Sequence, residues 1–191
     1  MALTLFSRIR TAPEPEHIPQ PWPEIGEIWK PEGVIVTQRF LGLAGAVLLV
    51  YTADAGVNGT YYAVACLGCS YSTRSKTDRD NYIASEHAGG EIANAHAAQC
   101  RALPQDLPIR PDDDIAREIV LRRLNLERRS DYDTTVYLTA FHLDRLALQR
   151  STEWIEEELQ RLADEQPEFL TAKPRTYGTS TEFTILRRPQ R

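Results

Sequence analysis

The sequence predicts an α+β fold with a small domain over residues 33–103 and a second domain over residues 112–191. Three observations indicate this division. Short runs of β-branched and aromatic residues come first and lead into a Cys-x-x-Cys pair. An alanine-rich stretch with helical spacing follows the pair. Residues 104–111 contain three prolines, which is typical of a linker, and helical and strand patterns alternate after it.

The first 32 residues are rich in proline and hold half of the 12 prolines in the chain. Proline lacks an amide donor and restricts the residue before it, so we expect residues 1–32 to be an extended segment. Trp22 and Trp29 are candidates for anchoring this segment on the domain that follows.

A β-hairpin is predicted just before the cysteines. Residues 45–52 form an apolar run typical of a buried strand, and residues 60–65 are rich in aromatic and β-branched side chains. The sequence Gly-Val-Asn-Gly at 56–59 is a strong turn signal between them. A shorter β-branched run at 34–36 predicts one further strand.

All three cysteines and one histidine have the spacing of a zinc site. Cys66 and Cys69 directly follow the second hairpin strand, and His96 and Cys100 lie four residues apart further along the chain. Three thiolates and one imidazole complete the tetrahedral shell of a structural Zn²⁺. The sequence therefore predicts a β-hairpin, a zinc knuckle and a helix, in that order.

The alanine-rich stretch 81–103 is predicted as the helix that carries the second pair of ligands. A helix interrupted or bent at Gly89-Gly90 would still place His96 and Cys100 one turn apart on the same face. His87 is the competing imidazole, and its spacing from Cys100 fits less well.

The second domain is predicted to contain three helices and three short strands. An acidic start at Asp112 to Asp114 suits a helix N-terminus, and Ser151 or Thr152 suits the start of the third helix. The second helix is expected to begin at Thr139. Strands are expected at 136–138, 168–171 and 182–186.

Residues 134–188 resemble the winged helix-turn-helix superfamily. Residues 138–146, 150–152 and 155–162 match its second helix, turn and recognition helix, so the predicted fold is a zinc domain followed by a winged helix-turn-helix domain. The resemblance implies that the third helix enters the major groove of DNA and that the wing contacts the backbone. The candidate contacts are basic residues of the wing, the turn and a loop beside Tyr71, namely Lys173, Arg175, Arg150, Arg74, Lys76 and Arg79.

The third helix departs from a DNA-reading helix in its charge. Glu153, Glu156 and Glu157 are expected to face outward, and such a face should repel phosphates unless a glutamate reads cytosine. An alternative function is a protein-interaction adaptor that binds a basic protein partner through Glu153, Trp154 and Glu157, since an exposed indole marks an interface hot spot.

Residues 60–103 resemble small zinc-binding proteins of actinobacterial plasmids and mobile elements, a resemblance that implies no established chemistry. The formal net charge of −5 removes bulk basicity as an argument for nucleic-acid binding. The longest apolar run, 40–51, is too short for a membrane helix, so we expect a cytoplasmic protein with no membrane partner.

We expect a zinc-stabilised, non-enzymatic, DNA-binding regulatory protein whose oligomeric state the sequence leaves open. A zinc enzyme is the third hypothesis. Glu86 and Glu91 could act as a general acid or base, but no His-x-Glu pattern accompanies the cysteines.

Overall fold

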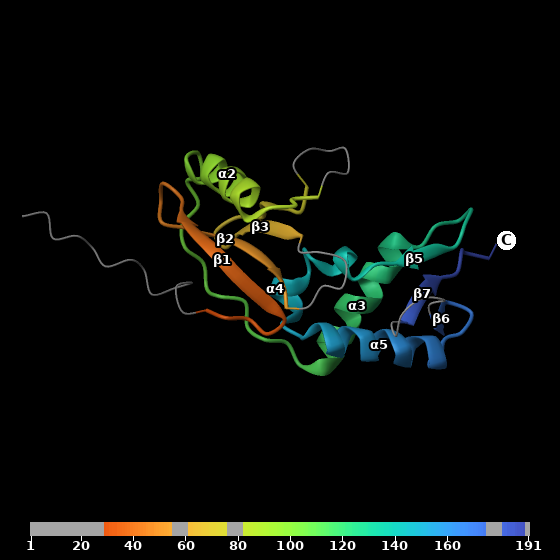
Figure 1. Cartoon of the computed structure of the whole chain (residues 1–191). Coiled ribbons are helices and arrows are strands. Elements are labelled where there is room, and N and C mark those ends of the chain that lie inside the picture. The colour runs from red at the N-terminus through yellow and green to blue at the C-terminus, as the bar shows by residue number, and fades with distance from the viewer. Residues whose placement is uncertain (1–28, 55–60, 76–81, 175–180, 190–191) are drawn as a thin grey trace, which may run out of the picture.

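The structure is a computed structural model that describes residues 29–54, 61–75, 82–174 and 181–189. Within these ranges the chain combines antiparallel sheets with helices, which confirms the α+β class (Figure 1). Most of the proline-rich segment and the predicted turn at 56–59 lie outside the described residues.

A four-stranded antiparallel sheet forms the first part of the structure. Its strands are β1 (Val34–Leu41), β2 (Val47–Ala53), β3 (Tyr62–Cys66) and β4 (Ser72–Thr73), in the order β1-β2-β3-β4. The predicted hairpin corresponds to β2 and β3. The prediction at 34–36 was too short, because β1 continues along the full length of β2.

The central strand β2 is buried on both faces of the sheet. Leu48 and Val50 pack against helix α2 (Glu86–Ala97) and the residues that flank it. On the other face, Leu49 and Tyr51 pack with Leu146 of the C-terminal part. This explains why β2 reads as a continuous apolar run and not as an alternating pattern. Trp29 also packs on the second face, as the sequence predicted for this residue.

Helix α2 is shorter than predicted and continuous through its glycine pair. Ser85 caps its start by accepting a hydrogen bond from the Ala88 amide. The predicted interruption at Gly89-Gly90 was wrong, because α2 continues through both glycines. A Cβ on Gly89 would lie 2.6 Å from Val50 Cγ1, so the glycines allow the helix to lie close against the sheet.

The C-terminal part packs three helices against a second sheet. Its helices are α3 (Asp113–Glu127), the short 3₁₀ helix η1 (Leu138–Phe141) with α4 (Arg145–Leu148), and α5 (Thr152–Glu165). Its strands β5 (Thr134–Val136), β6 (Leu170–Pro174) and β7 (Thr181–Ile185) have the order β5-β7-β6.

The predicted second helix is split in two, and its apolar residues pack into two different cores. Thr139 does not cap it, because η1 begins after Tyr137 without a side-chain cap. Phe141 enters the C-terminal core, whereas Leu143 and Leu146 contact the four-stranded sheet. The segment between η1 and α5 is therefore shared by both parts of the chain.

A buried arginine joins the end of β2 to the C-terminal part. Arg145 is fully buried, lies 3.6 Å from Asp54 as an ion pair and donates a 2.9 Å hydrogen bond to Thr152 Oγ1. Asp54 also accepts hydrogen bonds from the amide and hydroxyl of Thr152. The start of α5 is thus fixed to the sheet by one carboxylate.

His142, which also lies between the four-stranded sheet and the C-terminal part, is neutral near pH 7. His142 is buried, its backbone oxygen accepts a 3.1 Å hydrogen bond from Tyr51 Oη, and burial lowers the pKa of its ring to about 4. Two polar contacts, one from Arg145 at the start of α4 and one from His142 just before it, therefore accompany the apolar contact between the parts.

We predict that Asp54→Ala lowers the free energy of unfolding by about 3 kcal/mol, because Arg145 would stay buried without its ion-pair partner. Urea unfolding measures this difference. Asp106→Ala, at an exposed position of 104–111, is the control and should change stability by less than about 0.5 kcal/mol. Equal effects of the two substitutions would contradict the role given to Asp54.

Candidate metal centre

Three segments bring the predicted ligands together at one end of the four-stranded sheet. Cys66 is the last residue of β3, and Cys69 follows in the turn toward β4. His96 lies in the last turn of α2, and Cys100 lies just past the helix. The Cys100 amide still donates a 2.9 Å hydrogen bond to the His96 carbonyl, which preserves the helical spacing of the pair.

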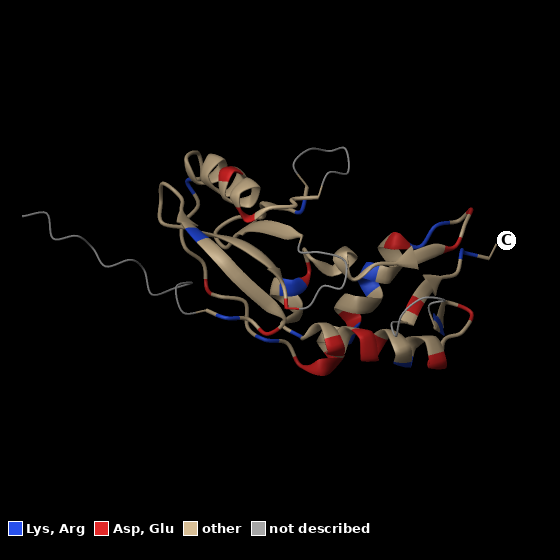
Figure 2. Cartoon of the chain, in the orientation of Figure 1, with Lys and Arg blue, Asp and Glu red and all other residues tan. Residues whose placement is uncertain are grey.

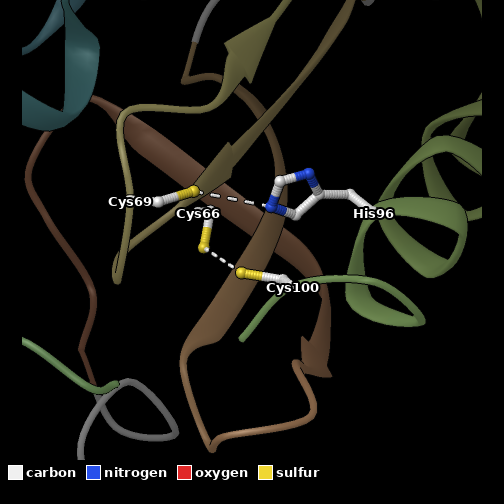
Figure 3. A group of neighbouring side chains, drawn as sticks. All are labelled: Cys66, Cys69, His96 and Cys100. Carbon is white, nitrogen blue, oxygen red and sulfur yellow. Dashed lines mark hydrogen bonds between the residues drawn. The ribbon is translucent and has the colours of Figure 1, made fainter. Parts of the chain in front are cut away.

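The four ligand atoms form one group that can hold a metal ion (Figure 3). All lie within 4.8 Å of one another. The Sγ atoms of Cys66 and Cys100 are 3.8 Å apart, and Cys69 Sγ is 3.5 Å from His96 Nε2. Bond lengths near 2.3 Å to sulfur and near 2.0 Å to nitrogen give tetrahedral edges of about 3.8 and about 3.5 Å. The spacing therefore fits a tetrahedral ion.

The turn between the two cysteines depends on Gly68. A Cβ at this position would lie 2.4 Å from Ala46 Cβ and 2.6 Å from the Leu103 carbonyl oxygen. Gln105 fixes the same turn by donating a 3.1 Å hydrogen bond to the Gly68 carbonyl. The segment after α2 thus packs over the knuckle and holds it in place.

The environment of Cys66 disfavours a free thiolate. Burial raises the pKa of this thiol to about 11, against the backbone amides of Gly68 and Cys69, which lower it. A cation in the cluster would replace the lost hydration and displace the proton. All three cysteines are free of disulfides.

Tyr71 is a site residue that the sequence placed only in a basic loop. Its ring stacks on the His96 imidazole with centroids 4.0 Å apart and an angle of 17° between the planes. Stacking fixes the plane of the imidazole and leaves Nε2 directed at the cysteines. An aromatic residue two positions after the knuckle was the only sequence signal for this contact.

His87, the competing imidazole, lies outside the cluster. Its side chain is 87% exposed and contacts Glu91 one helical turn further on. Glu86 and Glu91 likewise do not belong to the four-residue group.

Comparison with family models, curated proteins and solved structures found no match for this chain. Among the described residues, no helix combines the length and apolar character that spanning a bilayer requires. The assignment of function therefore depends on the geometry of the chain itself.

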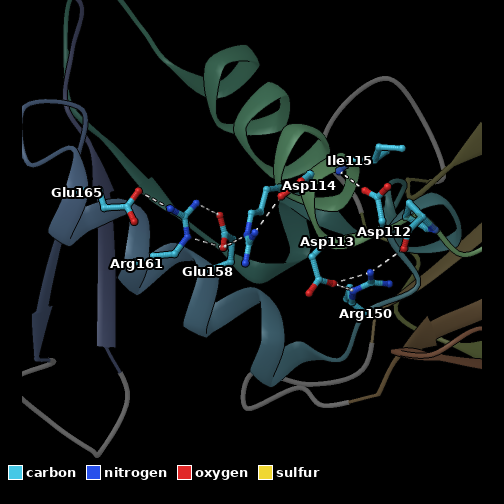
Figure 4. A network of polar contacts seen from close by, with 10 residues as sticks. Asp112, Asp113, Asp114, Ile115, Arg150, Glu158, Arg161 and Glu165 are labelled. Atoms are coloured by element: carbon cyan, nitrogen blue, oxygen red, sulfur yellow. Dashed lines mark hydrogen bonds and ion pairs between the residues drawn. The ribbon is translucent and has the colours of Figure 1, made fainter.

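Among the predicted nucleic-acid contacts, the prediction for Arg150 is wrong. Arg150 is 3% exposed and donates hydrogen bonds to Asp113 and to backbone carbonyls, so its guanidinium is not available to DNA (Figure 4). Arg74 bonds the Thr139 carbonyl at 2.6 Å and so links the two parts of the chain. Lys173 is exposed on β6, and Lys76, Arg79 and Arg175 lie outside the described residues.

Among the predicted partner contacts, Glu153 and Glu157 are exposed on α5. Trp154 is half-buried, packs on the C-terminal core and contacts the Arg150 guanidinium 5.4 Å from its ring centre. Trp154 is therefore engaged within the chain, which weakens it as an anchor for a partner.

Glu158 is an acidic residue of α5 that does not contribute to its exposed acidic face. It is buried and pairs with Arg117 of α3 and Arg161 of α5 (Figure 4). The pairing joins two helices and satisfies the buried charge.

We predict that Gly68→Ala reduces zinc affinity by at least about tenfold, because the added methyl group would displace the turn that positions Cys66 and Cys69. Competition with a chromophoric chelator measures the affinity. Ser70→Ala changes an exposed residue of the same turn and should leave affinity unchanged. Identical affinities for the two variants would contradict the role assigned to Gly68.

Proposed function

We propose that this chain is a zinc-stabilised, non-enzymatic binding protein in which Cys66, Cys69, His96 and Cys100 hold one Zn²⁺. The four-ligand geometry carries the proposal, since a tetrahedral ion with four protein ligands has no open position for a substrate. A zinc enzyme would require such a position, so this third hypothesis lacks support.

The packing of α2 supports a structural role for the ion. The buried residues of this 12-residue helix are Ala88, Gly89, Gly90, Ala93 and Ala97. Alanine and glycine bury little apolar surface, so the helix gains little from the hydrophobic effect. Ligation of His96 and Cys100 would supply the missing attachment to β3.

We predict that Cys66→Ser and Cys100→Ser each lose stoichiometric zinc and unfold the four-stranded sheet together with α2. Metal analysis of the purified protein and circular dichroism measure the two effects. His87→Ala is the matched control, because this exposed histidine lies outside the ligand group. Full zinc content in both cysteine variants would contradict the ligand assignment.

Nucleic-acid binding is the function we propose for the C-terminal part. Its helices and strands follow in the order α3, β5, η1 with α4, α5, β6, β7, and the sheet order is β5-β7-β6. Both features support a winged helix-turn-helix arrangement. Because Glu153, Glu156 and Glu157 are exposed on α5, binding has to use basic residues elsewhere.

A protein-interaction adaptor is the second candidate function. The exposed carboxylates of α5 lie near those of Asp113 and Asp114 at the start of α3. The Arg117–Glu158 contact joins α5 to α3, and the Arg150–Asp113 contact joins α3 to the turn just before α5 (Figure 4). This surface has the charge that a basic protein partner would require.

We predict that the zinc-loaded chain binds duplex DNA of random sequence with an affinity that falls steeply as salt rises, because arginine–phosphate contacts release counterions. Fluorescence anisotropy over a salt series measures this dependence. No binding to duplex or single-stranded nucleic acid at low salt would contradict the proposal. Binding of a basic peptide that Glu153→Gln and Glu157→Gln abolish would instead favour the adaptor.

A further inference from the structure

Four arginines converge where α3 ends beside the end of β7. Arg128 donates hydrogen bonds to the carbonyls of Leu186 and Arg187, at 2.8 and 3.3 Å. The Arg188 amide donates a 3.0 Å hydrogen bond to the Arg129 carbonyl. Two segments almost 60 residues apart in the sequence are thus held side by side. We name this group, Arg128, Arg129, Arg187 and Arg188, the arginine end.

Three of these four guanidinium groups are unengaged within the part of the chain that the structure describes. The side chains of Arg129, Arg187 and Arg188 make no hydrogen bond or ion pair there, and Arg187 and Arg188 are exposed. Arg128 is different, since its guanidinium lies 4.9 Å from the ring centre of Phe169 and also donates to the two carbonyls just after β7. It therefore positions the other three.

Acidic residues also lie close to the arginine end, but among the described residues none of them pairs with its guanidinium groups. Glu127 pairs with Arg123 within α3. Asp133 accepts a hydrogen bond from the Arg187 backbone amide and not from its guanidinium. Asp131 is exposed in the same loop.

Acidic and basic residues are unevenly distributed over the C-terminal part. Figure 2 shows acidic residues gathered along α5 and at the start of α3, basic residues next to acidic ones where the chain leaves α3, and further basic residues near the end of the chain. A polyanion would be repelled by the acidic residues along α5 and attracted to the basic residues.

We propose that the arginine end binds the phosphate backbone of a nucleic acid, a proposal that rests on the nucleic-acid function above. Guanidinium groups form paired hydrogen bonds with phosphate oxygens, and a nucleic acid presents phosphates in a row that several arginines can contact together. Tyr132, 53% exposed and three residues beyond Arg129, adds an aromatic face on which an unpaired base can stack.

This location differs from the wing predicted from sequence. Lys173 lies opposite Glu182 in the β6–β7 pairing, near the start of β7, whereas the arginine end follows the opposite end of that strand. The surface we propose therefore combines the end of α3 with the end of β7, and it leaves α5 facing away from the phosphates.

The test uses the zinc-loaded full chain and a variant that carries Arg129→Gln, Arg187→Gln and Arg188→Gln. Arg128 is retained because it bonds the end of β7. The control variant carries Lys30→Gln, Arg101→Gln and Arg110→Gln, which removes the same charge from exposed positions in other segments. Each protein is titrated with labelled random-sequence duplex DNA, a single-stranded oligonucleotide and anionic phospholipid vesicles over a salt series. Circular dichroism checks that each variant is folded.

We expect the arginine variant to bind nucleic acid at least about tenfold more weakly than the natural chain. The slope of the logarithm of its binding constant against the logarithm of salt concentration should be shallower by about three, and the control variant should bind like the natural chain. If the natural chain binds and the arginine variant keeps its affinity and slope, the surface assignment is wrong although nucleic-acid binding stands. If the natural chain binds no nucleic acid, the proposed function fails, and selective binding to vesicles would identify a membrane surface instead.

Discussion

We propose that the attachment of helix α2 to the sheet depends on metal ligation more than on apolar burial. Its buried face consists of alanine and glycine, and a helix of 12 residues is too short to be stable by itself in water. The sulfur and nitrogen atoms at its end meet Cys66 and Cys69 at distances that suit one tetrahedral ion. An ion there would hold α2 against one face of β2, and that face would otherwise be exposed to water.

The opposite face of the sheet is covered by apolar side chains and a buried ion pair of the C-terminal part. Leu143 and Leu146 of the C-terminal part pack on it, and Arg145 reaches the end of β2 through its contact with Asp54. The two parts of the chain therefore share a core at α4, although the prolines at 104–111 are typical of a linker. If an ion holds α2 as we propose, its removal would expose one face of β2 and weaken the surface on which α4 rests.

The sequence predicted those features that depend on local spacing. The ligand group follows from the Cys-x-x-Cys and His-x-x-x-Cys patterns, and the Ser151 cap of α5 is confirmed by its hydrogen bond from the Trp154 amide. Features that depend on distant contacts were missed. Arg150 was a candidate nucleic-acid contact because it is a basic residue of the predicted turn, yet the carbonyls around it and Asp113 accept hydrogen bonds from its guanidinium in the interior. The arginine end likewise forms only when β7 returns to the end of α3, a contact that no local pattern encodes.

The central claim, a tetrahedral ion held by three thiolates and one imidazole, is tested most directly by replacing zinc with Co²⁺ in the full chain. Cobalt has a visible absorption spectrum that depends on the number and type of its ligands. The account predicts one Co²⁺ per chain, intense tetrahedral d–d bands with thiolate charge-transfer absorption, and displacement of cobalt by one equivalent of Zn²⁺. Weak octahedral bands, or a folded α2 and sheet in protein that binds no metal, would contradict it.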